Sequence, residues 1–127
     1  MARIMIVDDA LMMRTTLRKI LEKAGHEIVC EAINGEQAII NYPHCQPDLV
    51  TMDITMPGLG GIETIKRIIE SDSAAQIIVV SALGQKNVVF DALQNGAKNY
   101  VLKPITEDKV LPVVNLVLEQ NSLATAN

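Results

Sequence analysis

Aromatic residues are scarce in this chain of 127 residues, which has two tyrosines, one phenylalanine and no tryptophan. A hydrophobic core must therefore be aliphatic, in agreement with a hydrophobic content of 49%. Cationic residues are also in the minority, since 11 Lys and Arg stand against 15 Asp and Glu and give a net charge of −4. Without a basic run, that balance argues against binding to nucleic acid or to an anionic membrane.

Cysteines are few as well, and the two present, Cys30 and Cys45, match neither a Cys-x-x-Cys motif nor a zinc-like spacing. We expect both to be free thiols that pack as small residues in a reducing compartment. No apolar run approaches the 18 residues typical of a membrane-spanning helix, and no signal-peptide pattern opens the chain. The expected location is the cytoplasm, with no membrane association.

Four short apolar runs end directly in residues that can handle phosphate or a divalent cation. These runs, rich in branched residues, are typical of strands buried on both faces of a parallel sheet. Residues 4–7 are followed by Asp8 and Asp9, 49–52 by Asp53, 77–80 by Ser81, and 100–102 by Lys103. Because open α/β sheets bind ligands outside the carboxyl ends of their strands, these side chains are predicted to share one edge. Such a set could hold Mg²⁺ and receive a phosphoryl group.

Helical patterns alternate with the strands. The predicted helices cover residues 10–24, a segment that begins after Asn34 and ends before Pro43, the segment containing Ile62 to Ile69, residues 86–95, and about 106–120. The first of these carries Leu11, Leu17, Ile20 and Leu21 at helical spacing, and residues 27–31 form a further short strand. Pro112 conflicts with the last helix, which either starts at Pro112 or has an irregular first turn.

This alternation predicts an α/β fold, a (βα)₅ doubly wound parallel five-stranded sheet in three layers. We expect one domain over residues 1–120, a frayed tail at 121–127 and no output domain.

The ordered strand-end residues resemble the receiver domain of two-component response regulators. The resemblance covers about residues 2–120 and rests on Val7-Asp8-Asp9, Met52-Asp53-Ile54-Thr55-Met56-Pro57, Val80-Ser81-Ala82, Gly96-Ala97 and Lys103-Pro104. It implies a flavodoxin-like, CheY-like fold. Because the chain stops after the last helix, it resembles a free-standing receiver of the CheY chemotaxis type.

The resemblance also implies a metal site. Asp9 and Asp53 would ligate Mg²⁺ directly, the backbone carbonyl of Thr55 would be the third protein ligand, and Asp8 would act mostly through a coordinated water. Clustered carboxylates repel one another unless a cation lies among them, and Mg²⁺ prefers such oxygen ligands.

The same resemblance assigns the phosphoryl chemistry. Asp53 would be the phosphoacceptor, attacking the phosphohistidine of a sensor histidine kinase, while Lys103 and Ser81 contact phosphoryl oxygens. The acyl phosphate would undergo slow autodephosphorylation. We also expect a cis Lys103–Pro104 bond, which aims the ammonium group over the strand ends.

The output implied by the resemblance is a switch. Ser81 would move towards the phosphoryl group, Tyr100 would turn inward behind it, and the face formed by residues 86–120 would change its partner binding. Thr55 and Leu83 occupy the two positions that tune phosphoryl lifetime. We expect a monomer whose partners are the kinase, a phosphatase and a downstream target such as the flagellar motor switch. The Gly-rich stretch within 56–61 predicts a mobile loop.

Four alternatives stay open. The chain could be a receiver cut from a larger transcriptional or enzymatic regulator, or a phosphate sink. A haloacid dehalogenase-type phosphatase would need a second acid, which Asp53-Ile54-Thr55 lacks. A flavodoxin-like FMN carrier would show a phosphate-binding loop after the first strand, where Asp8-Asp9-Ala10 stands instead.

Overall fold

The computed structural model describes the backbone of residues 1–56 and 58–126 and the side chains of residues 1–56 and 58–121. Within these residues five strands alternate strictly with five helices, as predicted. In chain order they are β1 (Arg3–Val7), α1 (Leu11–Lys23), β2 (Glu27–Ala32), α2 (Gly35–Cys45), β3 (Leu49–Asp53), α3 (Gly61–Ser71), β4 (Ile77–Ser81), α4 (Lys86–Gln94), β5 (Asn99–Leu102) and α5 (Glu107–Ala126).

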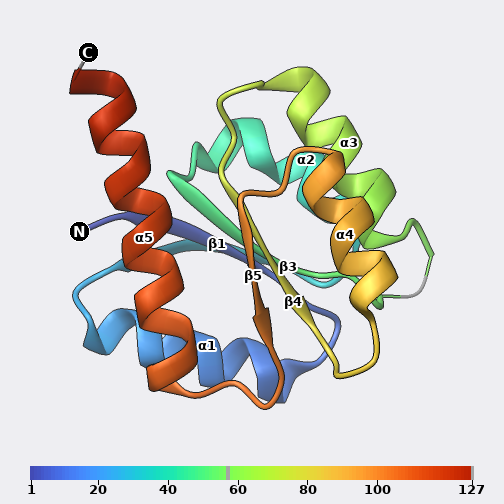
Figure 1. Ribbon diagram of the computed structural model, residues 1–127, viewed down its shortest axis with the longest axis horizontal. Helices are drawn as coiled ribbons and strands as arrows, with labels where there is room; N and C mark the ends of the chain where they lie inside the picture. Colours follow the sequence, from blue (N-terminus) through green and yellow to red (C-terminus); the bar gives the residue numbers. More distant parts are fainter. Residues whose placement is uncertain (57, 127) are drawn as a thin grey trace.

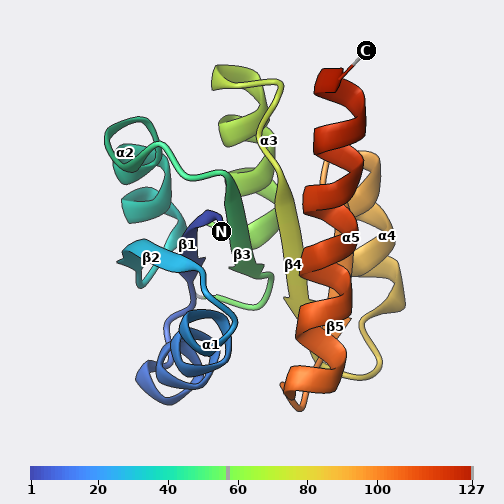
Figure 2. The same cartoon turned by 90° about the vertical axis from the view of Figure 1, so that its left-hand side faces the viewer.

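All five strands are parallel and lie in the order β2-β1-β3-β4-β5. The predicted doubly wound sheet is thus confirmed. Helices α2, α3 and α4 cover one face and α1 and α5 the other, and β5 is an edge strand that runs between α4 and α5 (Figures 1 and 2). The chain order reverses between β1 and β3, where α/β sheets of this kind open a crevice for ligands.

Two aliphatic cores lie on opposite sides of the sheet, because alternate strand residues point to opposite faces. One core joins the sheet to α2, α3 and α4 through residues such as Met5, Val7, Val50, Met52, Ile65, Ile68, Val79, Val89 and Ala92. The other joins it to α1 and α5 through residues such as Ile4, Ile6, Leu17, Leu21, Ile78, Val80, Val110, Val114 and Val117. Burial on both sides holds the strand ends in fixed positions.

The prediction that the second helix ends before Pro43 is wrong, since α2 continues to Cys45. Pro43 lies in the last turn, where its missing N–H removes a single helical hydrogen bond. Tyr42 is buried and donates its hydroxyl to Asp72 Oδ2 at 2.8 Å, which holds this turn against α3. Gln46 then closes the helix in the left-handed region, with φ of 48°.

The last helix begins at Glu107, so the alternative in which it starts at Pro112 is wrong. The amides of Lys109 and Val110 both donate to the Thr106 carbonyl, at 3.1 and 3.0 Å, which tightens the first turn. Pro112 has no N–H to donate to the carbonyl of Asp108, four residues earlier, and because Asp108 is exposed, water can reach that carbonyl. The helix extends to Ala126, beyond the predicted end at residue 120.

Two smaller expectations concern apolar residues and thiols. The expected core residue Leu11 is 68% exposed, and the buried face of α1 is formed by Leu17, Ile20 and Leu21, with the partly buried Met13 packed against the same core. Cys30 and Cys45 are free, as predicted. Burial, followed by a hydrogen bond with Cys45, raises the pKa of the Cys30 thiol to about 12, so this thiol stays protonated and unreactive.

Candidate functional site

Three carboxylates meet where β1 and β3 end. Asp8 and Asp9 follow β1, Asp53 is the last residue of β3, and one oxygen from each lies within 4.8 Å of the others. Asp8 and Asp53 are buried, at 1% and 2% exposure, whereas Asp9 is exposed. The sheet therefore brings the three predicted acids together at its carboxyl edge.

Asp8 is held on several sides but keeps one oxygen without a partner. Its Oδ1 accepts the Ala10 amide at 2.9 Å, and its own amide donates to the Ala32 carbonyl at 3.0 Å. Within the described part of the chain, Asp8 Oδ2 is buried and has no hydrogen-bond partner. Burial raises the pKa of Asp8; the Ala10 hydrogen bond opposes this, and the nearby Asp53 charge adds to it. A buried, repelled and unsatisfied carboxylate favours a bound cation.

Asp53 presents two different oxygens. Thr55 donates to Oδ1 through its amide at 3.0 Å and through its hydroxyl at 2.8 Å. Oδ2 lies 3.8 Å from Lys103 Nζ in an ion pair whose lysine side chain is 26% exposed. Thr55 therefore orients the carboxylate by binding Oδ1, and Oδ2 faces the ammonium group of Lys103.

Lys103 reaches this position from the end of β5. Its amide donates to the Ser81 carbonyl at 2.8 Å, which extends the pairing of β4 with β5 to the site. The Lys103–Pro104 bond is cis, as predicted.

Ser81 is the last residue of β4 and is completely buried. Its Oγ has no hydrogen-bond partner among the described residues. A buried hydroxyl without a partner loses free energy relative to a hydrogen-bonded one. The Ser81 hydroxyl could donate to a bound anionic group, and Asp8 Oδ2 could accept a cation or its water, so both partnerless atoms are consistent with a ligand site at this edge of the sheet.

Gly61 and Arg14 also shape the site, and the sequence analysis did not identify them. A Cβ on Gly61 would lie 2.6 Å from Ile54 Cα and 3.1 Å from the Asp53 carbonyl, so only glycine lets α3 begin against the phosphoacceptor candidate. The Gly60-Gly61 pair in the sequence is the signal for this close approach, beyond the loop mobility that the Gly-rich stretch predicts. Arg14 donates to the Asp8 carbonyl at 2.9 Å.

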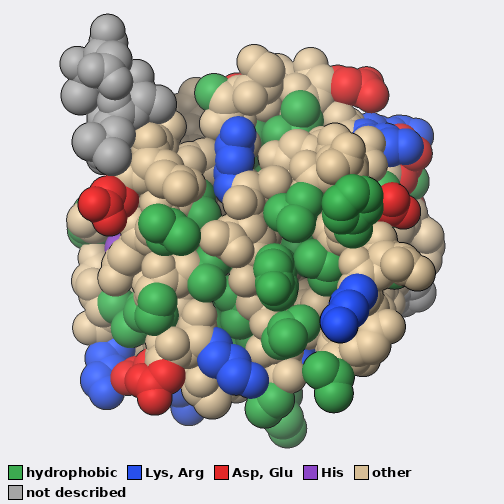
Figure 3. Space-filling model, in the orientation of Figure 1, with side chains coloured by type: hydrophobic (Ala, Val, Ile, Leu, Met, Phe, Trp, Pro, Cys, Tyr) green, Lys and Arg blue, Asp and Glu red, His purple; other side chains and the backbone are tan. Residues whose placement is uncertain are grey.

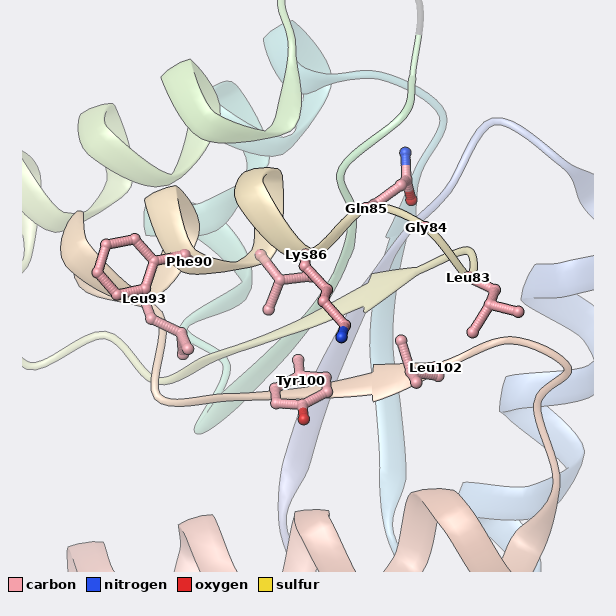
Figure 4. Close-up of a pocket in the computed structure, with 9 residues that line it drawn as sticks. Leu83, Gly84, Gln85, Lys86, Phe90, Leu93, Tyr100 and Leu102 are labelled. Atoms are coloured by element: carbon pink, nitrogen blue, oxygen red, sulfur yellow. The ribbon is translucent and has the colours of Figure 1, made fainter.

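One predicted switch residue, Tyr100, and one predicted lifetime residue, Leu83, line a second feature, an apolar pocket of about 290 Å³ between α4 and β5 (Figure 4). Tyr100 and Leu102 line it from β5, Phe90 and Leu93 line it from α4, and Leu83 lines it from the loop after Ser81. Phe90, Tyr100 and Leu83 are 60%, 42% and 84% exposed. Hydrophobic side chains gather over this part of the surface (Figure 3).

The donor set suits Mg²⁺. All the grouped ligand atoms are carboxylate oxygens, which this hard cation prefers, and the exposed Asp9 leaves room for the waters that Mg²⁺ retains. The partnerless oxygen of Asp8 could be satisfied by such a water.

Comparison with known proteins agrees with this arrangement. Residues 4–115 match the family model of the response regulator receiver domain, and the chain belongs to that family. Among its relatives, it is similar to the chemotaxis protein CheY of Bacillus subtilis, with 51% identity over 116 residues that cover 91% of this chain and 97% of that protein. CheY of Thermotoga maritima is 47% identical over 115 residues, covering 91% and 96%.

A solved structure of a CheX-CheY-BeF3-Mg+2 complex from Borrelia burgdorferi superposes with a TM-score of 0.87 at 39% identity. The match covers 91% of this chain and 88% of that one. The predicted family and its CheY type are thereby confirmed.

No helix among the described residues is both long enough and apolar enough to cross a bilayer.

Proposed function

We propose that this receiver accepts a phosphoryl group on Asp53 in a Mg²⁺-dependent reaction with the phosphohistidine of a sensor kinase, acting in the cytoplasm in chemotaxis. The observation that carries the proposal is the buried Asp53, with two neighbouring acids on one side and Lys103 Nζ at 3.8 Å on the other. Similarity to chemotaxis CheY proteins over nearly their whole length supports the pathway.

Each side chain has a role in the transfer. An oxygen of Asp53 attacks phosphorus, the bond from phosphorus to the histidine nitrogen breaks, and the imidazole leaves. Asp9, Asp53 and the Thr55 carbonyl would hold Mg²⁺, with Asp8 acting through a water. The bound metal would neutralise phosphoryl charge, which is the main requirement of this chemistry.

Lys103 and Ser81 then stabilise the product. The ammonium group pairs with Asp53 before transfer and is placed to pair with a phosphoryl oxygen afterwards. The partnerless Ser81 hydroxyl would gain an acceptor in that oxygen. Attack by water on the acyl phosphate gives slow autodephosphorylation.

Thr55 and Leu83 are proposed to set the lifetime of the phosphoryl group. The Thr55 hydroxyl already contacts Asp53 Oδ1, and the exposed Leu83 side chain follows Ser81. Neither group can activate a water as a carboxylate would. A partner phosphatase would therefore supply that function, and the complex of the Borrelia relative with CheX supports such a protein partner.

The metal site is tested by Asp9→Asn. Mg²⁺ binding to the wild type is expected in the millimolar-to-submillimolar range, because this ion dehydrates reluctantly, and the variant is expected to bind at least about tenfold more weakly after losing a charged ligand. NMR titration of backbone amides near Asp53 measures both affinities. Asp91→Asn, an exposed acid on α4, is the matched control. Equal affinities for wild type and Asp9→Asn would contradict the site.

The output is proposed to be the face formed by α4, β5 and α5, within residues 86–120. Ser81 ends β4, which pairs with β5, and Tyr100 extends from β5 into the apolar pocket against α4. Movement of Ser81 towards a phosphoryl oxygen would therefore be transmitted to the surroundings of Tyr100. The downstream target, such as the flagellar motor switch, would recognise the changed face.

Hydrogen exchange with and without beryllofluoride tests this coupling. We expect exchange in α4 and β5 to change on activation and Tyr100→Ala to weaken that response, with a coupling free energy of about 1–3 kcal/mol. Ile40→Ala, which truncates a side chain 64% exposed on α2, is the control. If only the loops after Asp9, Asp53 and Ser81 respond, the chain acts as a phosphate sink.

A further inference from the structure

We infer that Arg14 is a positioning residue for the metal site, fixing the Asp8–Asp9 turn through the main chain of Asp8. This inference rests on the proposed Mg²⁺ site. Arg14 lies in the first turns of α1 with its side chain 13% exposed. Its Nε donates to Glu31 Oε1 at 2.8 Å and its Nη1 donates to the Asp8 carbonyl at 2.9 Å. The guanidinium group thus ties the end of β1 to β2.

Glu31 is a firm anchor because Arg18 holds its other oxygen. Arg18 donates to Glu31 Oε2 through Nε at 2.9 Å and Nη2 at 2.6 Å, and through Nη1 to Glu22 at 3.1 Å. Burial alone would raise the pKa of Glu31, but the hydrogen bonds from Arg18 and Arg14 outweigh it and lower that pKa. Glu31 therefore stays charged, and Arg14 has a fixed partner.

Three restraints then act on Asp8. Its amide donates to the Ala32 carbonyl at 3.0 Å, its Oδ1 accepts the Ala10 amide at 2.9 Å, and its carbonyl accepts Arg14 Nη1. Oδ2 is left as the oxygen without a partner, within the acidic cluster. The rigid turn presents Asp8 and the adjacent Asp9 to a cation without further ordering cost.

The charge of Arg14 acts in the opposite direction. Arg14 and Asp9 line the same surface hollow, and a cation there repels a second cation. If Arg14 acts by positioning Asp8, neutralising Arg14 should weaken Mg²⁺ binding. If Arg14 acts only through its charge, the same change should strengthen Mg²⁺ binding. Arg14→Lys keeps the charge but has no planar fork to reach both Glu31 and the Asp8 carbonyl.

The test is Mg²⁺ affinity, measured by NMR titration of the Asp9 and Ala10 amides, in Arg14→Gln, Arg14→Lys and Glu31→Gln. We expect the Mg²⁺ Kd to rise about tenfold in both Arg14 variants, since loss of a residue that orients a metal ligand typically weakens binding by about 10- to 100-fold. The Kd should also rise in Glu31→Gln. Arg67→Gln is the control, since Arg67 makes an exposed pair with Glu63 at 3.4 Å on α3. Phosphorylation by acetyl phosphate at saturating Mg²⁺ should reach the wild-type rate in Arg14→Gln, a recovery that general loss of structure would not allow.

An unchanged Kd in Arg14→Gln, including one accompanied by a lower melting temperature, overturns the inference. Tighter binding in Arg14→Gln together with wild-type binding in Arg14→Lys shows a charge effect alone and also overturns it. A wild type without saturable Mg²⁺ binding overturns the proposed metal site itself, and this inference with it.

Discussion

Asp53→Asn is expected to gain no phosphoryl group from acetyl phosphate and Mg²⁺, whereas the wild type gains one. The amide keeps the size of the carboxylate and can still accept the Thr55 hydrogen bonds at Oδ1, but it lacks a nucleophilic oxygen. Asp53 is 2% exposed, so its neighbours pack closely around it. An isosteric change is chosen because it leaves that packing in place.

Intact mass spectrometry measures the gain directly. Asp91→Asn, the exposed acid on α4, is expected to be phosphorylated like the wild type. Loss of phosphorylation on chelation of Mg²⁺ would link the reaction to the acidic cluster. An equal gain of mass in Asp53→Asn and wild type would move the phosphoacceptor to another residue.

Asp8→Asn is expected to be more stable than the wild type in Mg²⁺-free buffer at pH 7. The substitution removes a buried negative charge that is repelled by Asp53 and whose Oδ2 has no partner. The amide also replaces one carboxylate oxygen by an N–H donor beside the Asp53 carboxylate, and because hydrogen bonds to charged groups contribute roughly 1.5–3 kcal/mol, a gain of up to this size in the free energy of unfolding is expected. Urea unfolding followed by circular dichroism measures it, since the chain has no tryptophan.

The pH dependence of this gain follows from the raised pKa of Asp8. The folded state binds the Asp8 proton more tightly than the unfolded chain, so wild-type stability falls as pH rises from the usual aspartate pKa to the raised one. The difference in the free energy of unfolding between Asp8→Asn and the wild type should therefore be absent below the usual aspartate pKa. It should grow as pH rises through this window and stay constant above the raised pKa. Saturating Mg²⁺ should reduce this difference in the free energy of unfolding, because the cation compensates the wild-type charge. If Asp8→Asn is less stable than the wild type at pH 7 without metal, the repulsion argument is wrong.

The sheet and its functional edge could be predicted because their signals are local. Each buried run is apolar up to its last residue, and Asp53, Ser81 and Lys103 follow without a spacer, so strand pairing alone brings them together. Thr55 beside Asp53 follows from the chain itself, two residues away.

Features that depend on contacts between distant residues could not be predicted. Pro43 predicts a helix end, and only the hydrogen bond of Tyr42 to Asp72, the residue that follows α3, shows why α2 continues. Arg14 and Glu31 look like ordinary surface charges in the sequence, because nothing local indicates that α1 brings the guanidinium group against β2 and the Asp8 carbonyl. Leu11 matches the helical period yet lies on the exposed face.

The edge position of β5 has a consequence for self-association. An edge strand offers unpaired backbone groups to other chains, and the exposed Tyr100 and Phe90 nearby would add apolar attraction. Here the edge is four residues long, and it is bounded by Lys98 and by Lys103 followed by Pro104. Short length, flanking cations and proline are the features with which sheets avoid pairing edge to edge. The apolar surface can thus remain open to a folded partner without recruiting copies of this chain into a continuous sheet.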